Sequence, residues 1–294
     1  MTISTSTPVT KVASLEELRA LIQWAADEGW NPGLDDVALF HGTDPSGFFV
    51  TYLGDRPVAG ISVVKHSDEQ AFLGLYLCVP EFRGTGFGLA TWNHALTSVA
   101  NRTVGLDGVV EQQDNYRQSD FAYHFGNTRY SGPLLPSLIK ATASESQLST
   151  HTIRPAKSDD LDALVQYDAL VGGFERRAFL NAWLAPSDSR YTYLAVEDEV
   201  IVGMLGIRKC IEGFKIGPLF ADSSAIARQL LLPAAAVADG DNVMLDVSDK
   251  NSAAVEMATS LKLQPIFETA RMYKGAAPAM DLQKLFGVAT LELG

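Results

Sequence analysis

The stretch LYLCVPEFRGTGFGLATWNHAL, residues 75–96, decides the fold class. It starts within an almost wholly apolar run, 71–79, that ends at Pro80, and it continues into an arginine and three glycines. An apolar run of this kind that stops at a proline is typical of a buried strand. Apolar residues return at helical spacing after Gly88. We therefore predict that residues 83–88 form a turn from a strand into a helix.

The glycines of this turn indicate an anion site. Gly84, Gly86 and Gly88 allow positive φ and close approach of a ligand to the main chain, and the start of a helix favours negative charge. We predict phosphate binding, although a tight connection explains the glycines equally well. A Walker loop needs a lysine that is absent here. A dinucleotide fingerprint needs wider glycine spacing, but Asp107 lies about 20 residues further on, so this alternative stays open.

Composition sets broad limits on the class of protein. The 294 residues with 47% hydrophobic content can form one large or two ordinary domains. There is no apolar run of about 18 residues and no export signal in 1–11, so we expect no membrane insertion and a cytoplasmic location. A net charge of −12 argues against nucleic acid and anionic membrane as partners and is compatible with an amine substrate. The oligomeric state is not indicated.

Metal and disulfide chemistry find no support in the sequence. Cys78 and Cys210 are the two cysteines, and we expect both to be reduced. The five histidines are scattered and form no pair with metal-ligand spacing. We therefore predict no metal site.

The chain also repeats itself. Three glycine pairs, in the same order, are each 143 residues apart: Gly60 and Gly203, Gly74 and Gly217, Gly132 and Gly275. A shared offset at separate places indicates a duplicated module. We predict a first domain over 1–139, a polar linker over 140–152 and a second domain over 153–294. After Ala221 the second copy reads Asp-Ser-Ser in place of the arginine and glycines. The glycine loop is therefore not needed merely to build the fold.

Two motifs carry a resemblance to a known family. The pattern Arg83-x-x-Gly86-x-Gly88 and the segment YRQSDF, 116–121, resemble motifs of the GNAT family of acetyl-CoA-dependent N-acetyltransferases. Asp120 stands where the family usually has glycine, and the second copy matches only in the order of its elements. The resemblance implies an α+β fold of three α/β/α layers. It further implies two tandem GNAT-like modules with mixed, mostly antiparallel sheets, the second of them degenerate.

The resemblance also implies a reaction and its residues. The protein is expected to move an acetyl group from acetyl-CoA to a primary amine of a small-molecule or peptide acceptor by direct attack. A non-catalytic acyl-CoA sensor or interaction protein is the alternative. Tyr116 would protonate the leaving thiolate as general acid. The residues that the resemblance assigns to acetyl-CoA are Tyr76, Leu77, Cys78, Arg83, Gly84, Thr85, Gly86, Phe87, Gly88 and Leu89.

Other side chains are open to more than one interpretation. Asp107 and Glu111 are candidate bases, but Asp246 matches Asp107 in the copy that lacks the loop, which favours a structural role for Asp107. Trp30 falls where acceptor sites of the family are often lined, and it could equally cover the end of a helix.

Overall fold

One continuous mixed sheet forms the centre of the molecule. The computed structural model describes residues 7–142 and 151–294. Within these ranges thirteen strands join in one sheet. Most neighbouring strands are antiparallel, and β4 with β5 and β10 with β11 are the parallel pairs. The strands are β1 Val9–Val12, β2 Phe48–Leu53, β3 Arg56–Lys65, β4 Gln70–Cys78, β5 Thr103–Val109, β6 Ala122–Pro133, β7 Thr152–Pro155, β8 Arg190–Glu197, β9 Val200–Lys209, β10 Phe214–Ala221, β11 Asn242–Ser248, β12 Gln264–Lys274 and β13 Leu285–Gly287.

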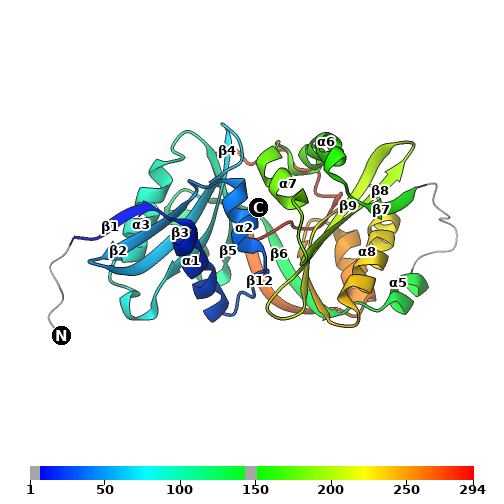
Figure 1. Cartoon of the computed structure of the whole chain (residues 1–294), viewed down its shortest axis with the longest axis horizontal. Coiled ribbons are helices and arrows are strands. Elements are labelled where there is room, and N and C mark those ends of the chain that lie inside the picture. The colour runs from blue at the N-terminus through cyan, green and yellow to red at the C-terminus, as the bar shows by residue number, and fades with distance from the viewer. Residues whose placement is uncertain (1–6, 143–150) are drawn as a thin grey trace.

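Helices cover the sheet (Figure 1). Apolar side chains of α1, α2, α6 and α7 belong to one large core, and those of α3 belong to a second core with β3, β4 and β5. The helices are α1 Leu15–Asp27, α2 Asp36–Thr43, α3 Phe87–Thr97, α4 Gln113–Gln118, α5 Pro136–Thr142, α6 Leu161–Gly172, α7 Arg177–Leu184, α8 Ser224–Ala238 and α9 Ser252–Ser260, with short 3₁₀ turns η1 Pro80–Phe82, η2 Val110–Gln112 and η3 Ser158–Asp160. No helix in the described ranges is long and apolar enough to cross a membrane.

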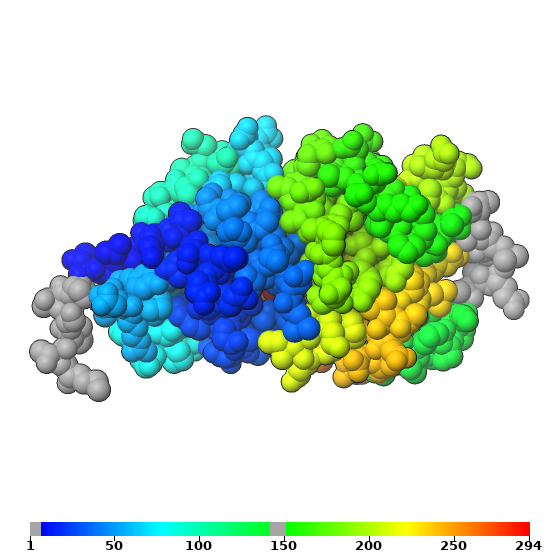
Figure 2. Space-filling model, viewed as in Figure 1, coloured from blue at the N-terminus to red at the C-terminus, as the bar shows by residue number. Residues whose placement is uncertain are grey.

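The two halves of the chain exchange strands at the middle of the sheet. The strand order is β1-β2-β3-β4-β5-β12-β6-β11-β10-β9-β8-β7. Strand β12 comes from the C-terminal half but pairs with β5, while β6 comes from the N-terminal half and pairs with β11. The halves meet along a seam across the molecule (Figure 2). The predicted α+β fold with a mixed, mostly antiparallel sheet is confirmed.

The predicted domain bounds follow chain order, whereas strand pairing crosses the middle of the chain. The bounds 1–139 and 153–294 therefore stay a prediction about the duplicated units. Of the expected linker 140–152, residues 143–150 lie outside the described part of the chain.

Two buried ion pairs join the exchanged strands to their new neighbours. Arg129 of β6 donates two hydrogen bonds of 2.8 Å to Asp246 of β11. Arg271 of β12 donates bonds of 2.8 and 2.7 Å to Asp107 of β5. Each exchanged strand thus brings an arginine to the aspartate of the other half. Asp107 has the structural role that its match with Asp246 predicted.

Candidate active site

The sheet divides within the first half of the chain, between β4 and β5. The parallel ladder between these strands ends at Leu73 and Leu106. Leu75 follows with a φ of +45°, and the register with β3 shifts here, so β4 carries a bulge. Beyond it, β4 stays paired with β3 as far as Cys78. From Gly74 onward no described strand pairs with the other edge of β4. We call this opening the first fork.

The glycine loop lies at the open end of the first fork. Gly84 and Gly86 have φ of +74° and +94°, and a Cβ on either would meet no atom within 4 Å. Gly86 is the N-cap of α3, and no side chain caps this helix start. Apart from the Gly88 N–H, which interacts with the Cys78 thiol, the first backbone N–H groups of α3 are therefore available to a ligand. Gly88 has a different function, because a Cβ there would approach the Tyr76 hydroxyl to 2.9 Å.

Polar side chains of the loop hold it in place. Arg83 Nε donates to the carbonyl oxygen of Cys78 at 3.0 Å, and its guanidinium pairs with Glu28 at the end of α1. Thr85 Oγ1 donates to the carbonyl oxygen of Phe82 at 2.6 Å. These two side chains anchor the loop, so its main chain is the part best placed to bind an anion.

The remaining loop and strand positions are apolar or neutral. The Phe87 ring meets Phe82 edge-on at 5.6 Å, Leu89 is 59% exposed, and Leu77 is buried in the core. Burial raises the pKa of the Cys78 thiol, against the opposing effects of Arg83 and the Gly88 amide. Ligand binding here would accordingly use the backbone of these residues.

Tyr116 is clamped beside the first fork. Its ring stacks on Trp92 of α3, with centroids 5.5 Å apart and planes at 16°. The ring also lies against Gly108 of β5, where a Cβ would approach ring carbons Cδ2 and Cε2 to 2.7 Å. Burial, with a smaller effect from Tyr76, raises the pKa of Tyr116 to about 12. The phenol therefore remains protonated at neutral pH and can donate a proton.

A second phenol, that of Tyr76, lies near Tyr116, and the sequence did not indicate it. The Tyr76 ring lies 5.2 Å from the ring of Trp92, the same side chain on which Tyr116 stacks. Its pKa is also raised, mainly by burial. We expected only the main chain of Tyr76 to take part in the site, because the pattern of apolar residues in a strand does not show where a side-chain hydroxyl group lies.

The candidate bases occupy different environments. Asp107 is fully buried, and both its oxygens accept hydrogen bonds from Arg271, one of them also from Asn127. Burial, against the opposing effect of Arg271, raises the pKa of Asp107, but both carboxylate oxygens are held by Arg271 and turned away from a substrate amine. Glu111 is exposed in η2.

The sequence did not indicate Glu292, whose backbone lies on Gly74 at the first fork and whose carboxylate lies 3.9 Å from Lys215 Nζ.

Comparisons with known proteins agree with this geometry. Family models described as "Acetyltransferase (GNAT) family" and "Acetyltransferase (GNAT) domain" match residues 15–126 and 164–287. Holothin acyltransferase of Pseudoalteromonas sp. (strain SANK 73390) is 32% identical over 285 residues, which is 97% of this chain and 94% of that protein. The chain belongs to the GNAT family.

Solved structures of an acetyltransferase and of a tandem GNAT protein share the fold. A putative acetyltransferase from Pyrococcus horikoshii superposes with a TM-score of 0.79 at 18% identity, over 98% of this chain and 96% of that one. A tandem GNAT protein from the clavulanic acid biosynthesis pathway has a TM-score of 0.63 at 12% identity, over 91% and 98%. The predicted tandem GNAT arrangement is confirmed.

The second GNAT module has an equivalent fork, but the chain itself fills it. The ladder between β10 and β11 ends at Ile216 and Leu245. Beyond it β13 pairs with β10, and the Val288 N–H donates to the Asp246 carbonyl oxygen of β11 at 2.9 Å. Residues 285–294, which we call the tail, thus enter the second fork. In addition, Ser223 caps α8 by accepting from the Ile226 N–H at 3.3 Å. Neither an open fork nor an uncapped loop is present in this module.

The second GNAT module also holds the loop between α1 and α2 of the first. The Asn31 side chain exchanges hydrogen bonds of 2.7 and 2.9 Å with the backbone of Glu212. Lys215 Nζ donates to the Trp30 carbonyl oxygen at 3.0 Å. Trp30 is therefore part of the contact between modules as well as a cover for the end of α1.

Proposed function

We propose that this protein is an acetyl-CoA-dependent N-acetyltransferase with one active site, at the first fork. The supporting observation is that an unpaired strand edge and an uncapped glycine loop occur together in one module only. The open space at Gly84 and Gly86 fits a phosphate against the main chain. The residues that would hold the molecule are Tyr76, Leu77 and Cys78 on β4 and 83–89 in the loop.

The chemistry follows from these positions. When bound, acetyl-CoA supplies a thioester whose carbonyl carbon accepts the amine. Main-chain N–H groups of β4 would orient and polarise that carbonyl. Tyr116 would give its proton to the departing sulfur. Holding the amine beside the thioester supplies most of the acceleration, so no nucleophilic side chain is needed.

Acyl transfer is the activity that the family descriptions and one relative name. GNAT acyltransferases act on small-molecule or peptide acceptors, and one relative is named a holothin acyltransferase. These observations support acyl transfer as the reaction of this chain. The choice of acetyl as the acyl group and of a primary amine as the acceptor is our proposal.

Titration calorimetry with acetyl-CoA tests this proposal. We expect one site per chain, and we expect Gly86→Val to abolish binding by blocking approach to the loop. Gly54→Val is the matched control, because Gly54 also has a positive φ, +61°, with open space around it, but lies in the turn between β2 and β3. Two sites per chain, or a preference for NAD, would contradict the proposal.

A turnover assay separates the enzyme from the alternative function. Release of free CoA thiol in the presence of a panel of amines is the expected result. Binding of one acetyl-CoA without turnover of any amine would instead favour a sensor or interaction protein.

A further inference from the structure

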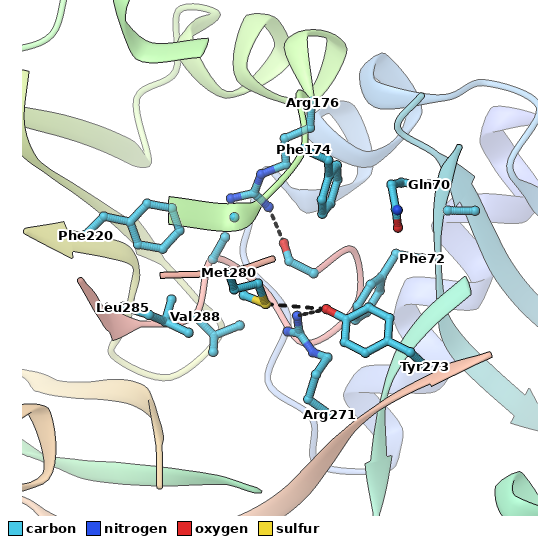
Figure 3. A pocket seen from close by; sticks show the side chains of 14 residues that line it. Gln70, Phe72, Phe174, Arg176, Phe220, Arg271, Tyr273, Met280, Leu285 and Val288 are labelled. Carbon is cyan, nitrogen blue, oxygen red and sulfur yellow. Dashed lines mark hydrogen bonds between the residues drawn. The ribbon is translucent and has the colours of Figure 1, made fainter. Parts of the chain in front are cut away.

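The tail lies between the two modules, and the space that it leaves there is small. Figure 3 shows Val288 of the tail on the side of Phe220, with Phe72 of the first module across the space from them. The cavity between these side chains has a volume of about 30 Å³, which is room for about one or two water molecules. It is too small for an acceptor molecule, so the residues that meet the acceptor have to be sought at the first fork itself.

Glu292 of the tail brings a carboxylate to the first fork. Its backbone packs directly on Gly74, which follows the last ladder residue of β4, and a Cβ on Gly74 would overlap its carbonyl oxygen. Burial raises the pKa of Asp107 against the opposing effect of Arg271, and the negative charge of Glu292 adds to the rise. Asp107 follows the last ladder residue of β5. Glu292 therefore touches one strand of the fork and acts electrostatically on the other.

Glu292 differs from the other buried carboxylates in the described part of the chain, because it accepts no hydrogen bond. Its side chain is 9% exposed, and its Oε2 atom is buried without a hydrogen-bond partner. The neighbouring cations, Lys215 at 3.9 Å and Arg208 at 4.0 Å, lie beyond hydrogen-bond distance. At least one hydrogen bond reaches each of the carboxylates of Asp36, Asp44, Asp107, Asp168 and Asp246. A buried acceptor without a donor is costly, which indicates an interaction that forms only with a ligand.

The two cations near Glu292 have other partners. Arg208 Nε lies 3.2 Å from a carboxylate oxygen of Asp36. Lys215 Nζ donates to the Trp30 carbonyl oxygen at 3.0 Å, in the loop between α1 and α2. The two positive charges balance the charge of Glu292 without occupying its lone pairs, so this carboxylate can still accept a hydrogen bond or a proton.

Strand β4 separates Glu292 from Tyr116. Successive side chains of a strand point to opposite faces. Leu77 belongs to the same core as Leu293, the neighbour of Glu292 in the tail. Tyr76 belongs with Tyr116 to the core that contains α3. A thioester held along the open edge of β4 would therefore have Glu292 on one face and Tyr116 on the other.

We propose that Glu292 is the base that takes the proton lost by the acceptor amine. The inference rests on the proposed function and names the base that this function leaves open. Asp107 is held by Arg271, and Glu111 is exposed in η2, so neither base considered from the sequence combines burial with a free lone pair. The acceptor accordingly reaches the fork from the side of the tail.

The reaction balances with these two residues. The amine nitrogen forms a bond to the thioester carbon and becomes positively charged, which makes its proton acidic enough for a carboxylate to accept. The carbon–sulfur bond breaks, and the sulfur takes the proton of the Tyr116 phenol. The proton on Glu292 then passes to water, and the Tyr116 phenolate takes one back. No oxidant, reductant or additional co-reactant is required.

An NMR titration tests the contact between amine and carboxylate without turnover. Methylamine is the probe, because it is the smallest primary amine and requires no pocket. In the full chain with ¹³C-labelled glutamate carboxyl groups, loss of a resonance in Glu292→Gln assigns Glu292. We expect methylammonium chloride to shift this resonance saturably, whereas sodium chloride should not. Glu268 is the control residue, because it is exposed on β12 and should show no saturable shift. An unshifted Glu292 resonance would overturn the inference.

Kinetics test the proton transfer. Glu292→Gln keeps the size of the side chain and removes the base. With the amine that wild type acetylates fastest, we expect turnover at saturating acetyl-CoA to fall about 10²–10⁴-fold, while the affinity for acetyl-CoA stays the same. Glu268→Gln is the matched control and should stay within about threefold of wild type.

Rescue by a small carboxylate separates a base from a structural residue. Formate can occupy the space that Glu292→Ala leaves, so we expect it to raise the turnover of this variant at least about tenfold and to leave Glu292→Gln unchanged. Wild-type turnover in Glu292→Gln with normal acetyl-CoA binding, or loss of turnover in Glu292→Ala that formate does not restore, would reject the inference alone. Absence of acetyl-CoA binding, or of turnover with every amine in wild type, would reject the proposed function and the base with it.

Discussion

Gly74 and Gly217 lie against the same tail, at residues four positions apart along it. A Cβ on Gly74 would overlap the carbonyl oxygen of Glu292, and a Cβ on Gly217 would overlap that of Val288. Each glycine directly follows the last ladder residue of its fork, Leu73 in the first module and Ile216 in the second. The tail therefore crosses both forks, and the duplicated glycines let its backbone approach each sheet.

Replacing either glycine by alanine should weaken the contact with the tail. The added methyl group cannot be accommodated without moving backbone, and overpacking of this kind costs about 1–3 kcal/mol. We expect Gly74→Ala and Gly217→Ala each to lower the free energy of unfolding in urea by about this amount. Gly172→Ala is the control, because a Cβ at Gly172 meets no atom within 4 Å. Unchanged stability in both variants would mean that the tail does not pack as described.

The exchanged strands depend on their buried ion pairs. Arg129→Met leaves Asp246 buried without its partner, and breaking such a pair from one side costs about 3–5 kcal/mol. We expect a loss of this size in urea unfolding. Adding Asp246→Leu to Arg129→Met removes the unpaired charge and should recover a large part of the loss. Equal stability of the single and the double variant would contradict this reasoning.

The same pair predicts a pH dependence of stability. Burial by itself raises the pKa of Asp246, but the Arg129 guanidinium together with the charges of Lys215 and Arg208 outweighs burial and holds the pKa below its usual value. A carboxyl group of this kind stabilises the fold above the unfolded pKa of about 3.9, and it loses this contribution as the pH falls toward the folded pKa. The stability difference between wild type and Asp246→Asn should therefore shrink below about pH 4. A difference that stays constant from pH 3 to pH 7 would speak against it.

Local features of the site were predictable from the sequence. The strand 71–79, the turn after Pro80 and the helix that follows are encoded by apolar periodicity and by glycine, which act over a few residues. The match between Asp107 and Asp246 likewise indicated a structural role, which the ion pairs show. The roles of Tyr116 and of the loop in binding and catalysis stay predictions.

Long-range features were not predictable from the sequence. The exchange of β6 and β12 depends on pairing between residues more than a hundred positions apart, such as Arg129 with Asp246. In the sequence Gly217 matches Gly74, yet the tail pairs with the strands of the second fork and only packs over Gly74 at the first. Gly88 looks like a phosphate-loop glycine, whereas the structure places the Tyr76 hydroxyl 2.9 Å from the position that its Cβ would take.

The two phenols beside the first fork can be told apart by experiment. Tyr116 and Tyr76 both contact the Trp92 ring beside the first fork, and both can donate a proton at neutral pH, so either could serve the leaving sulfur. The Tyr116 phenol has a pKa of about 12. Since only its deprotonation would remove the donor, turnover should not decline between pH 8 and about pH 10 on account of this residue.

Tyr116→Phe keeps the ring stacked on Trp92 and removes only the proton. We expect turnover at saturating acetyl-CoA to fall about 10²–10⁴-fold, the range typical of a lost general acid, while acetyl-CoA affinity stays the same. Tyr76→Phe is the matched control, because it removes the other phenol that contacts Trp92, and it should stay within about threefold of wild type. If Tyr76→Phe shows the large loss and Tyr116→Phe does not, Tyr76 is the donor. If neither variant slows turnover, water or the acceptor protonates the sulfur.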